Sequence, residues 1–505
     1  MILTRLVQIV ILFTLYVVNF NSHAVAFTVI PKAGTALPKE VVIGNTVFAY
    51  YTVINNTKRP LTNIFVKYLP LNVSQIVDDP KLTDICGYQF ALASGGSCTL
   101  KLAIRGAVDA SDPNPQNHLF ICHPNIPACA GTYYPLNVVA HEPTIKGIVQ
   151  SGGTTSVLPL ANAVVKIYAA NTDTSSEIGS AITNSQGEFF IYISPDVLKM
   201  NNHHVIYALA QKNSAVILAN VIGTAVIPSI IINELTTVAA SYSMMQFFHD
   251  HRIYGSLKGT DIASMMSANL VSAKTGALSD VINNSPNADQ TNARRSLSTL
   301  ANLITPCVRN GGINCTNVFN AATVNGNVPS NTLDALLNIG RNPSNSVVAI
   351  FNLAAISQPF TPYLNAIPDA WTIAVKFNAT GDEQKCPFGG PGGIAIDNRG
   401  FIWLTNNVIQ STPNAINCAV VLKPNGQPAD GSNLSPKSPL FGGGLLGTGF
   451  GNDVAPDQSV WFGNFGWGSC SNCLPNGSAS KFTSTGYPIS GPNGYQSASP
   501  ADLYR

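Results

Sequence analysis

The spacing of hydrophobic residues changes twice along the chain. Up to about residue 232 these residues recur at every second position or in short β-branched runs, which is typical of strands. From Asn233 to Ala355 they recur every three to four residues, which indicates helices, and from Trp371 onward the strand pattern returns. We therefore expect a multidomain, mainly β protein with a helical middle domain. We expect an N-terminal signal segment (1–26), two β-sandwiches (27–141 and 142–212), a mostly helical domain (213–365) and a final part rich in strands (366–505).

Residues 27–141 are expected to form short strands separated by turns. Val41–Val53 is β-branched and aromatic, and Gly44-Asn45 inside it predicts a turn. Ile64–Tyr68 and Cys98–Ile104 alternate with a period of two, as half-buried strands do. Many short strands with turns between them favour a β-sandwich of the immunoglobulin-like (Ig-like) type.

Residues 142–212 are expected to form a second, smaller sandwich. The strands Ile145–Val149 and Ala163–Tyr168, and the turn Asn184–Gly187 before an aromatic strand, resemble the carboxypeptidase regulatory-like (prealbumin-like) family. That resemblance implies a spacer module. The apolar run Ser214–Ile232 that follows has 19 residues, about the length of a membrane span. Its interrupting polar, Gly and Pro residues and its β-branched content favour two buried strands with a turn instead.

Five helices are expected in the middle of the chain, with Asn233 as the N-cap of the first. They are Glu234–Phe248, Thr260–Ala273, Asn287–Val308, Pro329–Ile339 and Ser346–Ala355. The cluster His249-Asp250-His251-Arg252 has the residue types of a metal or acid–base site, but adjacent side chains point apart. We expect it to mark the end of the first helix, with its positive groups placed against the helix dipole.

The C-terminal part repeats a strand pattern at an interval of 58 residues. Gly393–Asn407 returns as Gly451–Phe465, and each copy predicts two strands joined by a turn, with a second hairpin after it. Four strands per repeat are typical of a β-propeller blade. We expect residues 366–505, beginning with a strand at Trp371–Phe377, to contain a partial propeller of about two blades. Because the chain ends where another blade should begin, it looks like the front part of a longer protein.

Composition and the N-terminal segment point to an exported protein. Charged residues make up 10% of the chain and the net charge is +2, so a basic face for nucleic acid is not expected. Arg5, the apolar stretch Leu6–Val18 and Ala24-Val25-Ala26 match a secretory signal peptide with its cleavage site. We expect a secreted or periplasmic protein with no integral membrane span after signal removal. An uncleaved anchor is the alternative.

All ten cysteines follow the expected cleavage site, and an even number of them suits an oxidising compartment. Most have a close neighbour in sequence, which favours local disulfides. The close neighbours are Cys86 with Cys98, Cys122 with Cys129, Cys307 with Cys315 and Cys470 with Cys473, leaving Cys386 and Cys418. Cys470-Ser-Asn-Cys473 has the spacing of redox and zinc sites, but it lacks a βαβ context and a downstream His. No metal and no cofactor is therefore expected.

The order of the modules resembles that of secreted bacterial NHL-repeat proteins, which are similar to the streptogramin B (virginiamycin B) lyase propellers. Besides the two repeats, the stretches Ile231–Ala240 and Asp369–Ala374 carry the resemblance. The resemblance implies a propeller fold. In the lyases a His acts as the general base and is assisted by Glu and Mg²⁺. Here no His occurs after His251, and neither repeat contains Glu, so the base is missing.

Two functions remain open. The first is a non-catalytic binding or scaffold protein that contacts a protein or a glycan. Its candidate contact residues are Trp403, Trp461, Phe465 and Trp467, although Trp403 and Trp461 also suit the packing between blades. The second is a C–O lyase or hydrolase in the propeller, for which only acids are available. Those acids are Asp397, Asp430, Asp453 and Asp457, of which Asp397 is expected to cap its own turn.

Overall fold

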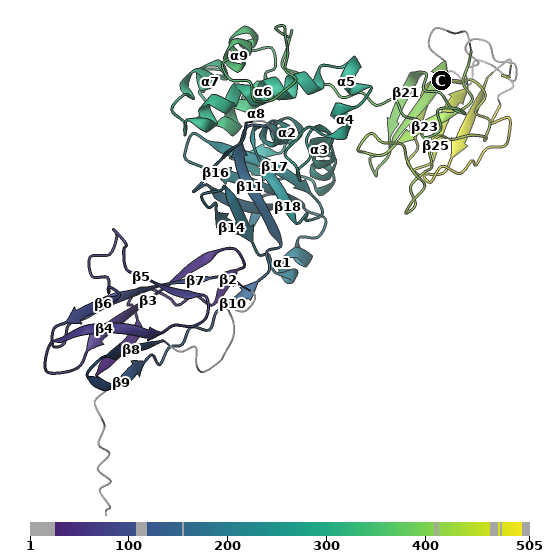
Figure 1. Cartoon of the computed structure of the whole chain (residues 1–505). Helices are drawn as coiled ribbons and strands as arrows, with labels where there is room; N and C mark the ends of the chain where they lie inside the picture. The colour runs from purple at the N-terminus through teal and green to yellow at the C-terminus, as the bar shows by residue number, and fades with distance from the viewer. Residues whose placement is uncertain are drawn as a thin grey trace, which may run out of the picture. The chain divides into compact units, whose positions relative to one another are not determined.

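The structure is a computed structural model that describes residues 26–107, 119–153, 156–408, 412, 414–464, 473–474 and 477–496. The chain divides into two compact units, Met1–Glu142 and Pro143–Arg505. We describe each unit by itself (Figure 1).

The first unit is a β-sandwich. β1, β3, β7 and β5 form one antiparallel sheet in that order, and β6, β4, β8 and β9 form the other. Tyr51 and Leu100 from the first sheet share a buried core with Ile64 and Ile121 from the second. The strands are β1 (Phe27–Pro31), β2 (Glu40–Val42), β3 (Thr46–Asn55), β4 (Leu61–Tyr68), β5 (Val73–Ile76), β6 (Gln89–Leu92), β7 (Ser97–Arg105), β8 (Phe120–His123), β9 (Ile126–Gly131) and β10 (Val139–His141).

The strand predictions for this unit are confirmed. β2 and β3 flank the turn at Gly44-Asn45, where Gly44 has a positive φ of 95°. The predicted strands Ile64–Tyr68 and Cys98–Ile104 fall inside β4 and β7. Burial alternates along β3, and the apolar inner faces of the two sheets pack on each other as in a sandwich.

The second unit begins with two more sheets. β12, β11 and β15 form one sheet, in which β18 pairs with β11 in parallel, and β14, β13, β16 and β17 form the other. Gly147 of β11 has no room for a side chain, because a Cβ there would lie 2.5 Å from the carbonyl oxygen of Ile230. The elements are β11 (Ile145–Ser151), β12 (Leu158–Pro159), β13 (Val164–Ala170), β14 (Ser175–Ile182), β15 (Glu188–Ile191), α1 (Pro195–Met200), β16 (Val205–Gln211), β17 (Ile217–Gly223) and β18 (Ser229–Ile232).

The apolar run 214–232 folds as two strands with a turn, as predicted. β17 pairs with β16, and β18 pairs with β11, so the run contributes one strand to each sheet. We expected a domain boundary at residue 212, but the sheets continue through residue 232. No helix in the described ranges is long and apolar enough to cross a membrane.

Helices cover these sheets and share their core. α2 and α3 pack on β17 (Figure 1), and the buried residues between Ile145 and Trp371 form two hydrophobic clusters that each combine strands with helices. Asn233 caps α2 as predicted, because its side chain accepts a hydrogen bond from the backbone N–H of Thr236. The helices are α2 (Glu234–Met244), α3 (Leu257–Leu270), α4 (Asp280–Asn283), α5 (Asn287–Gln290), α6 (Ala293–Arg309), α7 (Thr316–Ala321), α8 (Thr332–Arg341) and α9 (Val347–Ala354).

Three helix predictions were wrong in detail. The helix expected over Thr260–Ala273 begins and ends three residues earlier, as α3. The helix expected over Asn287–Val308 is split into α5 and α6, because Thr291 adopts an extended conformation with φ −130° between them. The first helix ends at Met244, four residues before the expected end. A β-hairpin of β19 (Phe248–His249) and β20 (Arg252–Ile253) follows it.

The cluster His249–Arg252 therefore does not end a helix, contrary to our expectation. Asp250 and His251 form the turn of the β19–β20 hairpin, with positive φ values of 45° and 61°. The His251 Nε2 lies 2.8 Å from the Asp334 carboxylate in the first turn of α8. His251 thus contacts the start of a different helix, whereas the Arg252 guanidinium lies 4.2 Å from the centroid of the Tyr168 ring.

The stretch Trp371–Phe377 was expected to be a strand, and this prediction was wrong. It forms no strand and pairs with no strand in the described part of the chain. Instead, the Asn287 side chain donates to the carbonyl oxygen of Lys376 and accepts from its N–H, at 3.0 and 2.7 Å. The Trp371 N–H also donates to the Pro343 carbonyl oxygen. Hydrogen bonds near both of its ends thus hold residues 371–377, called the strap below, against the helices.

The C-terminal part contains two similar antiparallel sheets (Figure 1). β21 (Gly390–Ile396), β22 (Ile402–Val408) and β23 (Ala419–Leu422) form the first. β24 (Thr448–Val454), β25 (Val460–Asn464) and β26 (Ser478–Phe482) form the second. The expected fourth strands, after the turns at 424–426 and 484–486, are present only as isolated bridges, Leu422 to Pro428 and Phe482 to Pro488. Two further bridges join Ala419 to Leu440 and Ala479 to Tyr495.

The described residues make a mainly β, multidomain protein of several small sheets, none of them closed into a barrel or ring. The two sandwiches and the helices in the middle of the chain agree with the predicted fold class at this level.

Candidate functional site

The two C-terminal sheets place Trp403 and Trp461 at the same position. Trp403 lies in the central strand β22 and is paired with Ala395 and Val421. Trp461 lies in the central strand β25 and is paired with Asp453 and Lys481. The repeat of 58 residues in the sequence is therefore also a repeat in strand register.

The surroundings of the two tryptophans differ. The face of the first sheet that carries Trp403 packs against the face of the second sheet that lies opposite Trp461. Trp403 is fully buried and packs with Val460, Phe462 and Phe482 of the second sheet. Its indole N–H donates to the Asp397 carboxylate at 3.3 Å. Trp403, a predicted contact residue, therefore fills the space between the sheets.

Trp461 is on the opposite face of its sheet from Val460 and Phe462, because side chains alternate along a strand. It is half-buried, and the ring of Tyr495 lies 5.5 Å from its ring centroid. The Lys481 ammonium lies 4.9 Å above the indole, within the range of a cation–π interaction. Tyr495 itself is 44% exposed, so the pair forms an aromatic surface that a partner can reach.

Polar groups border this aromatic pair. Lys481 also lies 3.6 Å from the Asp457 carboxylate, which is 63% exposed. Hydrogen bonds from Ser459 to Asp457, followed by the charge of Lys481, hold the pKa of this carboxyl below its ordinary value. The surface thus combines two aromatic rings with one cation and one carboxylate, a set that can stack on a ring and bind hydroxyl groups.

Phe465 and Trp467, the other predicted contact residues, lie outside the described residues. Sequence reasoning missed Tyr495 and Lys481. Lys481 could have been found, because it has the side-chain direction of Trp461 on the neighbouring strand. Tyr495 comes 34 residues after Trp461, and no local pattern predicts the isolated bridge that brings it close.

The four candidate acids have structural partners. Asp397 caps its turn as predicted, because its carboxylate accepts from the N–H groups of Arg399 and Phe401 at 2.9 and 3.0 Å. It also pairs with the Arg399 guanidinium. Asp430 bonds to Ser432 and Lys423, and Asp453 accepts from the N–H of Val454.

Among the described residues, no group of three or more His, Cys, Asp or Glu side chains could hold a metal ion. The buried Asn406 also has a structural role. Its amide donates to the Pro387 carbonyl oxygen at 2.9 Å and lies 3.3 Å from the sulfur atoms of Cys386 and Cys418.

The cysteines form disulfides within the described ranges, and the local pairing predicted for them is confirmed. The bonds join Cys86 to Cys98, Cys122 to Cys129, Cys307 to Cys315, and Cys386 to Cys418. Cys473 is also disulfide-bonded, and Cys470 lies outside the described residues. Disulfides in several parts of a chain are typical of proteins that fold outside the cytoplasm.

No model of a known protein family matches the chain. No curated protein matches it either. Among solved structures, 25% of the chain is similar to 24% of a 9R-lipoxygenase from Cyanothece PCC8801, with 13% identity and a TM-score of 0.13. Another similarity covers 38% of the chain and 60% of a variant of BcpA, the major pilin subunit of Bacillus cereus, with 8% identity and a TM-score of 0.17. TM-scores this low support no argument about fold or function.

Proposed function

We propose that the protein is exported and acts as a non-catalytic binding or scaffold protein. In this proposal the outer face of the β24–β26 sheet contacts a protein or a glycan, and the N-terminal sandwiches are spacers. The observation that carries it is the accessible pair of Trp461 and Tyr495 beside Lys481. At the matching position of the first sheet Trp403 is fully buried, whereas Trp461 is half-buried.

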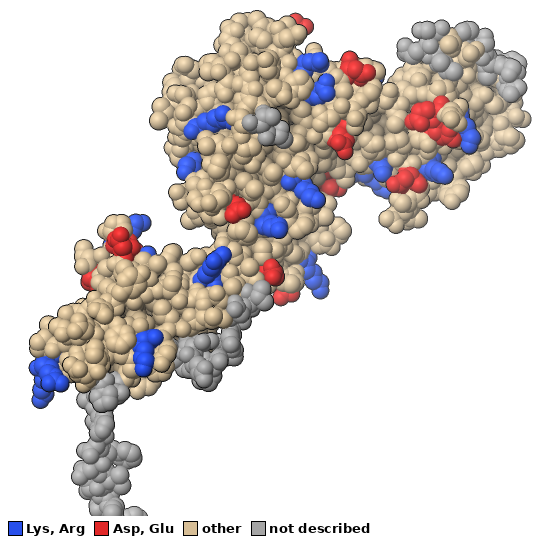
Figure 2. Space-filling model, in the orientation of Figure 1, with Lys and Arg blue, Asp and Glu red and all other residues tan. Residues whose placement is uncertain are grey.

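Charge supports a partner that is recognised by aromatic and polar contacts. On the face drawn in Figure 2, Lys, Arg, Asp and Glu side chains stand singly or in small groups among uncharged residues. The net charge of +2 for 505 residues provides little long-range attraction for a strongly charged partner. Stacking on Trp461 and hydrogen bonds to Asp457 and Lys481 would then dominate binding.

A glycan and protein array probed with the oxidised, mature protein tests this proposal. We expect binding that falls by tenfold or more, a loss of about 1.4 kcal/mol or more, when Trp461→Ala and Tyr495→Ala are combined. Tyr133→Ala is the matched control, because Tyr133 is an exposed aromatic residue of the first unit. A blank array, or equal binding by all variants, would contradict the proposal.

We further propose that the two C-terminal sheets are neighbouring blades of an NHL-type propeller. The shared register of Trp403 and Trp461 supports this, as does the packing of one sheet on the tryptophan face of the other. The related lyase activity is disfavoured, because Asp397, Asp430 and Asp457 are engaged in turns and ion pairs. Turnover of a cyclic depsipeptide lactone that stops on chelation would reverse this choice.

Export is part of the proposal and has its own test. The signal-like residues 1–26 and the disulfides support it. N-terminal sequencing of the protein recovered outside the cytoplasm should give a chain that begins at Phe27. An N-terminus that retains Leu6–Val18 would favour an anchor instead.

A further inference from the structure

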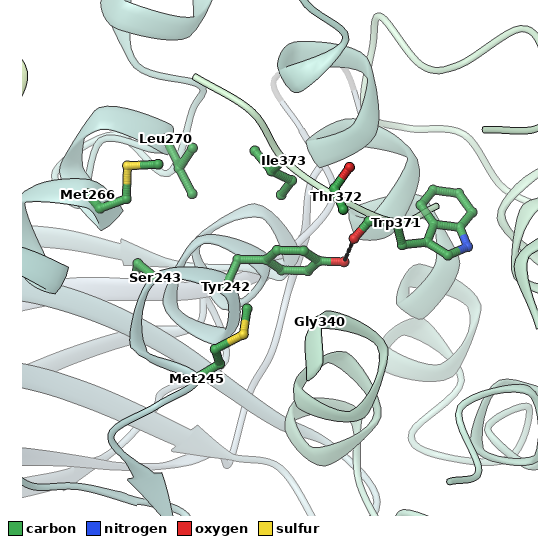
Figure 3. A pocket seen from close by; sticks show the side chains of 9 residues that line it. All are labelled: Tyr242, Ser243, Met245, Met266, Leu270, Gly340, Trp371, Thr372 and Ile373. Atoms are coloured by element: carbon green, nitrogen blue, oxygen red, sulfur yellow. Dashed lines mark hydrogen bonds between the residues drawn. The ribbon is translucent and has the colours of Figure 1, made fainter. Parts of the chain in front are cut away.

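A pocket opens on the surface of the helical layer, far in sequence from the aromatic pair of the C-terminal sheets. It is formed by α2, α3, α8 and the strap that follows Trp371, and its volume is about 210 Å³ (Figure 3). Its lining residues are Tyr242, Ser243, Met245, Met266, Leu270, Gly340, Trp371, Thr372 and Ile373. All of these side chains are uncharged.

Two polar side chains of the pocket are engaged with backbone carbonyl oxygens. The Tyr242 hydroxyl donates to the Trp371 carbonyl oxygen at 3.0 Å, and Figure 3 shows the Trp371 indole pointing away from Tyr242. Burial raises the pKa of Tyr242 far above its ordinary value, so this hydroxyl stays neutral. The Ser243 hydroxyl donates to the Ala239 carbonyl oxygen. A bound charge would find no compensating group here, which makes its desolvation costly.

The apolar side chains leave adaptable space. Met245 and Met266 are half-buried on either side of the opening, and methionine adjusts its shape to irregular ligands. Gly340 lies within α8, where a Cβ would be 3.0 Å from the Met245 methyl carbon. Glycine inside a helix is destabilising relative to alanine, yet here its missing side chain keeps the space beside Met245 open.

The walls of the pocket are fixed. The Arg341 guanidinium donates to the carbonyl oxygens of Met245 and Phe248 at 2.6 and 2.9 Å, which ties the end of α2 to α8. On the other side, Asn287 holds the strap through Lys376. The opening is therefore preformed, which lowers the entropic cost of binding.

We propose that this pocket binds an uncharged, mainly apolar group about the size of one aromatic ring. An apolar cavity of about 150 Å³ is known to accept benzene, so the volume here has room for a ring. Because the Tyr242 hydroxyl uses its proton toward Trp371, a ligand can only donate to its oxygen. The ligand class is thus a phenyl- or alkyl-bearing molecule with at most a hydroxyl at its inner end. This site is independent of the proposed contact surface around Trp461.

The test uses the full mature chain labelled with ¹³C at the methionine methyl groups. Benzyl alcohol is the probe, and benzoate is its charged counterpart. We expect saturable shifts of the Met245 and Met266 methyl signals with benzyl alcohol and no saturation with benzoate. Met200, which is 72% exposed, should not shift. Equal, non-saturating shifts of all three methionines would overturn the proposal.

Three substitutions sharpen the result. Ser243→Phe places a ring in the pocket and should weaken binding by about tenfold or more. Gln246→Phe adds the same ring at an exposed position outside the lining and should leave the affinity unchanged. A second filling variant, Gly340→Ala, should weaken binding while helix propensity maintains the thermal stability. Unchanged affinity in both filling variants, with native methyl spectra, would also refute the site.

Discussion

At the scale of residues, two aspartates of the C-terminal sheets differ sharply in their surroundings. The Asp397 side chain is fully buried beside Arg399 and the Trp403 indole. Asp457 is mostly exposed and bonds to Ser459 and Lys481. Removing a partner from a buried ion pair leaves an uncompensated charge, whereas an exposed pair is screened by water.

Asp397→Ala is therefore expected to lower the free energy of unfolding of the C-terminal sheets by about 2 kcal/mol, because N–H groups around the buried carboxylate lose their acceptor. Arg399 would lose its partner, and the N–H groups of Arg399 and Phe401 would lose their acceptor. Urea unfolding followed by tryptophan fluorescence measures the change. Asp457→Ala is the control and should leave the transition nearly unchanged. Equal effects of the two substitutions would show that the turn does not depend on Asp397.

The hairpin turn at His251 predicts a pH dependence. The hydrogen bond and charge of Asp334 raise the pKa of His251 above its ordinary value of 6.5, while partial burial and Arg252 oppose this and Asp250 adds to it. A raised folded-state pKa means that protonation stabilises the folded chain at low pH. That contribution is complete below the unfolded pKa and is lost as the pH rises through the folded pKa.

The unfolding free energy of the native chain minus that of Asp334→Asn should thus be larger at about pH 5.5 than at about pH 8.5. We expect a difference of less than about 1 kcal/mol, because both side chains are partly exposed. An NMR titration of the His251 ring checks the cause directly, since Asp334→Asn should lower its pKa. A His251 titration that is the same in both proteins would exclude this ion pair as the source.

At the scale of elements, glycines at equivalent repeat positions should respond oppositely to the same substitution. A Cβ at Gly393 of β21 would lie 2.3 Å from the Phe450 carbonyl oxygen, because the second sheet packs closely there. A Cβ at the matching Gly451 of β24 meets no atom within 4 Å. The crowding is thus a property of the contact between sheets and not of the strand itself.

Gly393→Ala is expected to destabilise the C-terminal part by about 2 kcal/mol, since backbone atoms must move apart. Gly451→Ala should stabilise it by about 0.5 kcal/mol, because alanine restricts the unfolded chain. Thermal unfolding of the two variants beside the native chain gives both values. If Gly393→Ala proved as stable as Gly451→Ala, the packing of the two sheets would have to be reconsidered.

Elements were predictable where the determining signals are local. The Gly44-Asn45 turn and the Asn233 cap were predicted correctly, because each depends on residues within one turn of chain. The hairpin at Asp250-His251 was missed, because non-glycine residues with positive φ give a weak signal in sequence. Trp371–Phe377 has the composition of a strand, but whether a strand finds a partner depends on the tertiary fold.

The candidate site was predictable only in part, for the same reason. The 58-residue repeat correctly aligned Trp403 with Trp461 in strand register. It could not tell which of them is buried, because burial depends on which face of each sheet meets the other. The contact of Trp461 with Tyr495 needs a loop to return to the sheet edge, and no periodic pattern encodes that return.

At the scale of the whole molecule, the two units should fold separately. The core of the first unit is formed entirely by residues between Ala26 and Ala140. The core of the second combines β11, β13 and β16 with strands and helices as far as Trp371. Folding boundaries should therefore follow these cores rather than the boundary at residue 212 that we expected from sequence.

Fragment 26–142 should thus unfold cooperatively in urea by itself, as should fragment 143–380. Fragment 143–212 should not, because its sheets lack β17 and β18 and the helices that cover them. Near-ultraviolet circular dichroism and the sharpness of the urea transition distinguish these cases. A sharp transition for fragment 143–212 would restore the earlier boundary.

The one-directional packing of the C-terminal sheets has a consequence for solubility. The first sheet packs on one face of the second, so Trp461 lies on the other face, half-buried beside Tyr495, which is 44% exposed. An exposed aromatic face of this kind can bind an identical chain, and repeated head-to-tail binding would produce a filament. Lys481 and Asp457 place opposite charges beside it, and another copy could cover the face only by dehydrating both. The same two charges that can help to recognise a partner would thus also disfavour the stacking of identical chains.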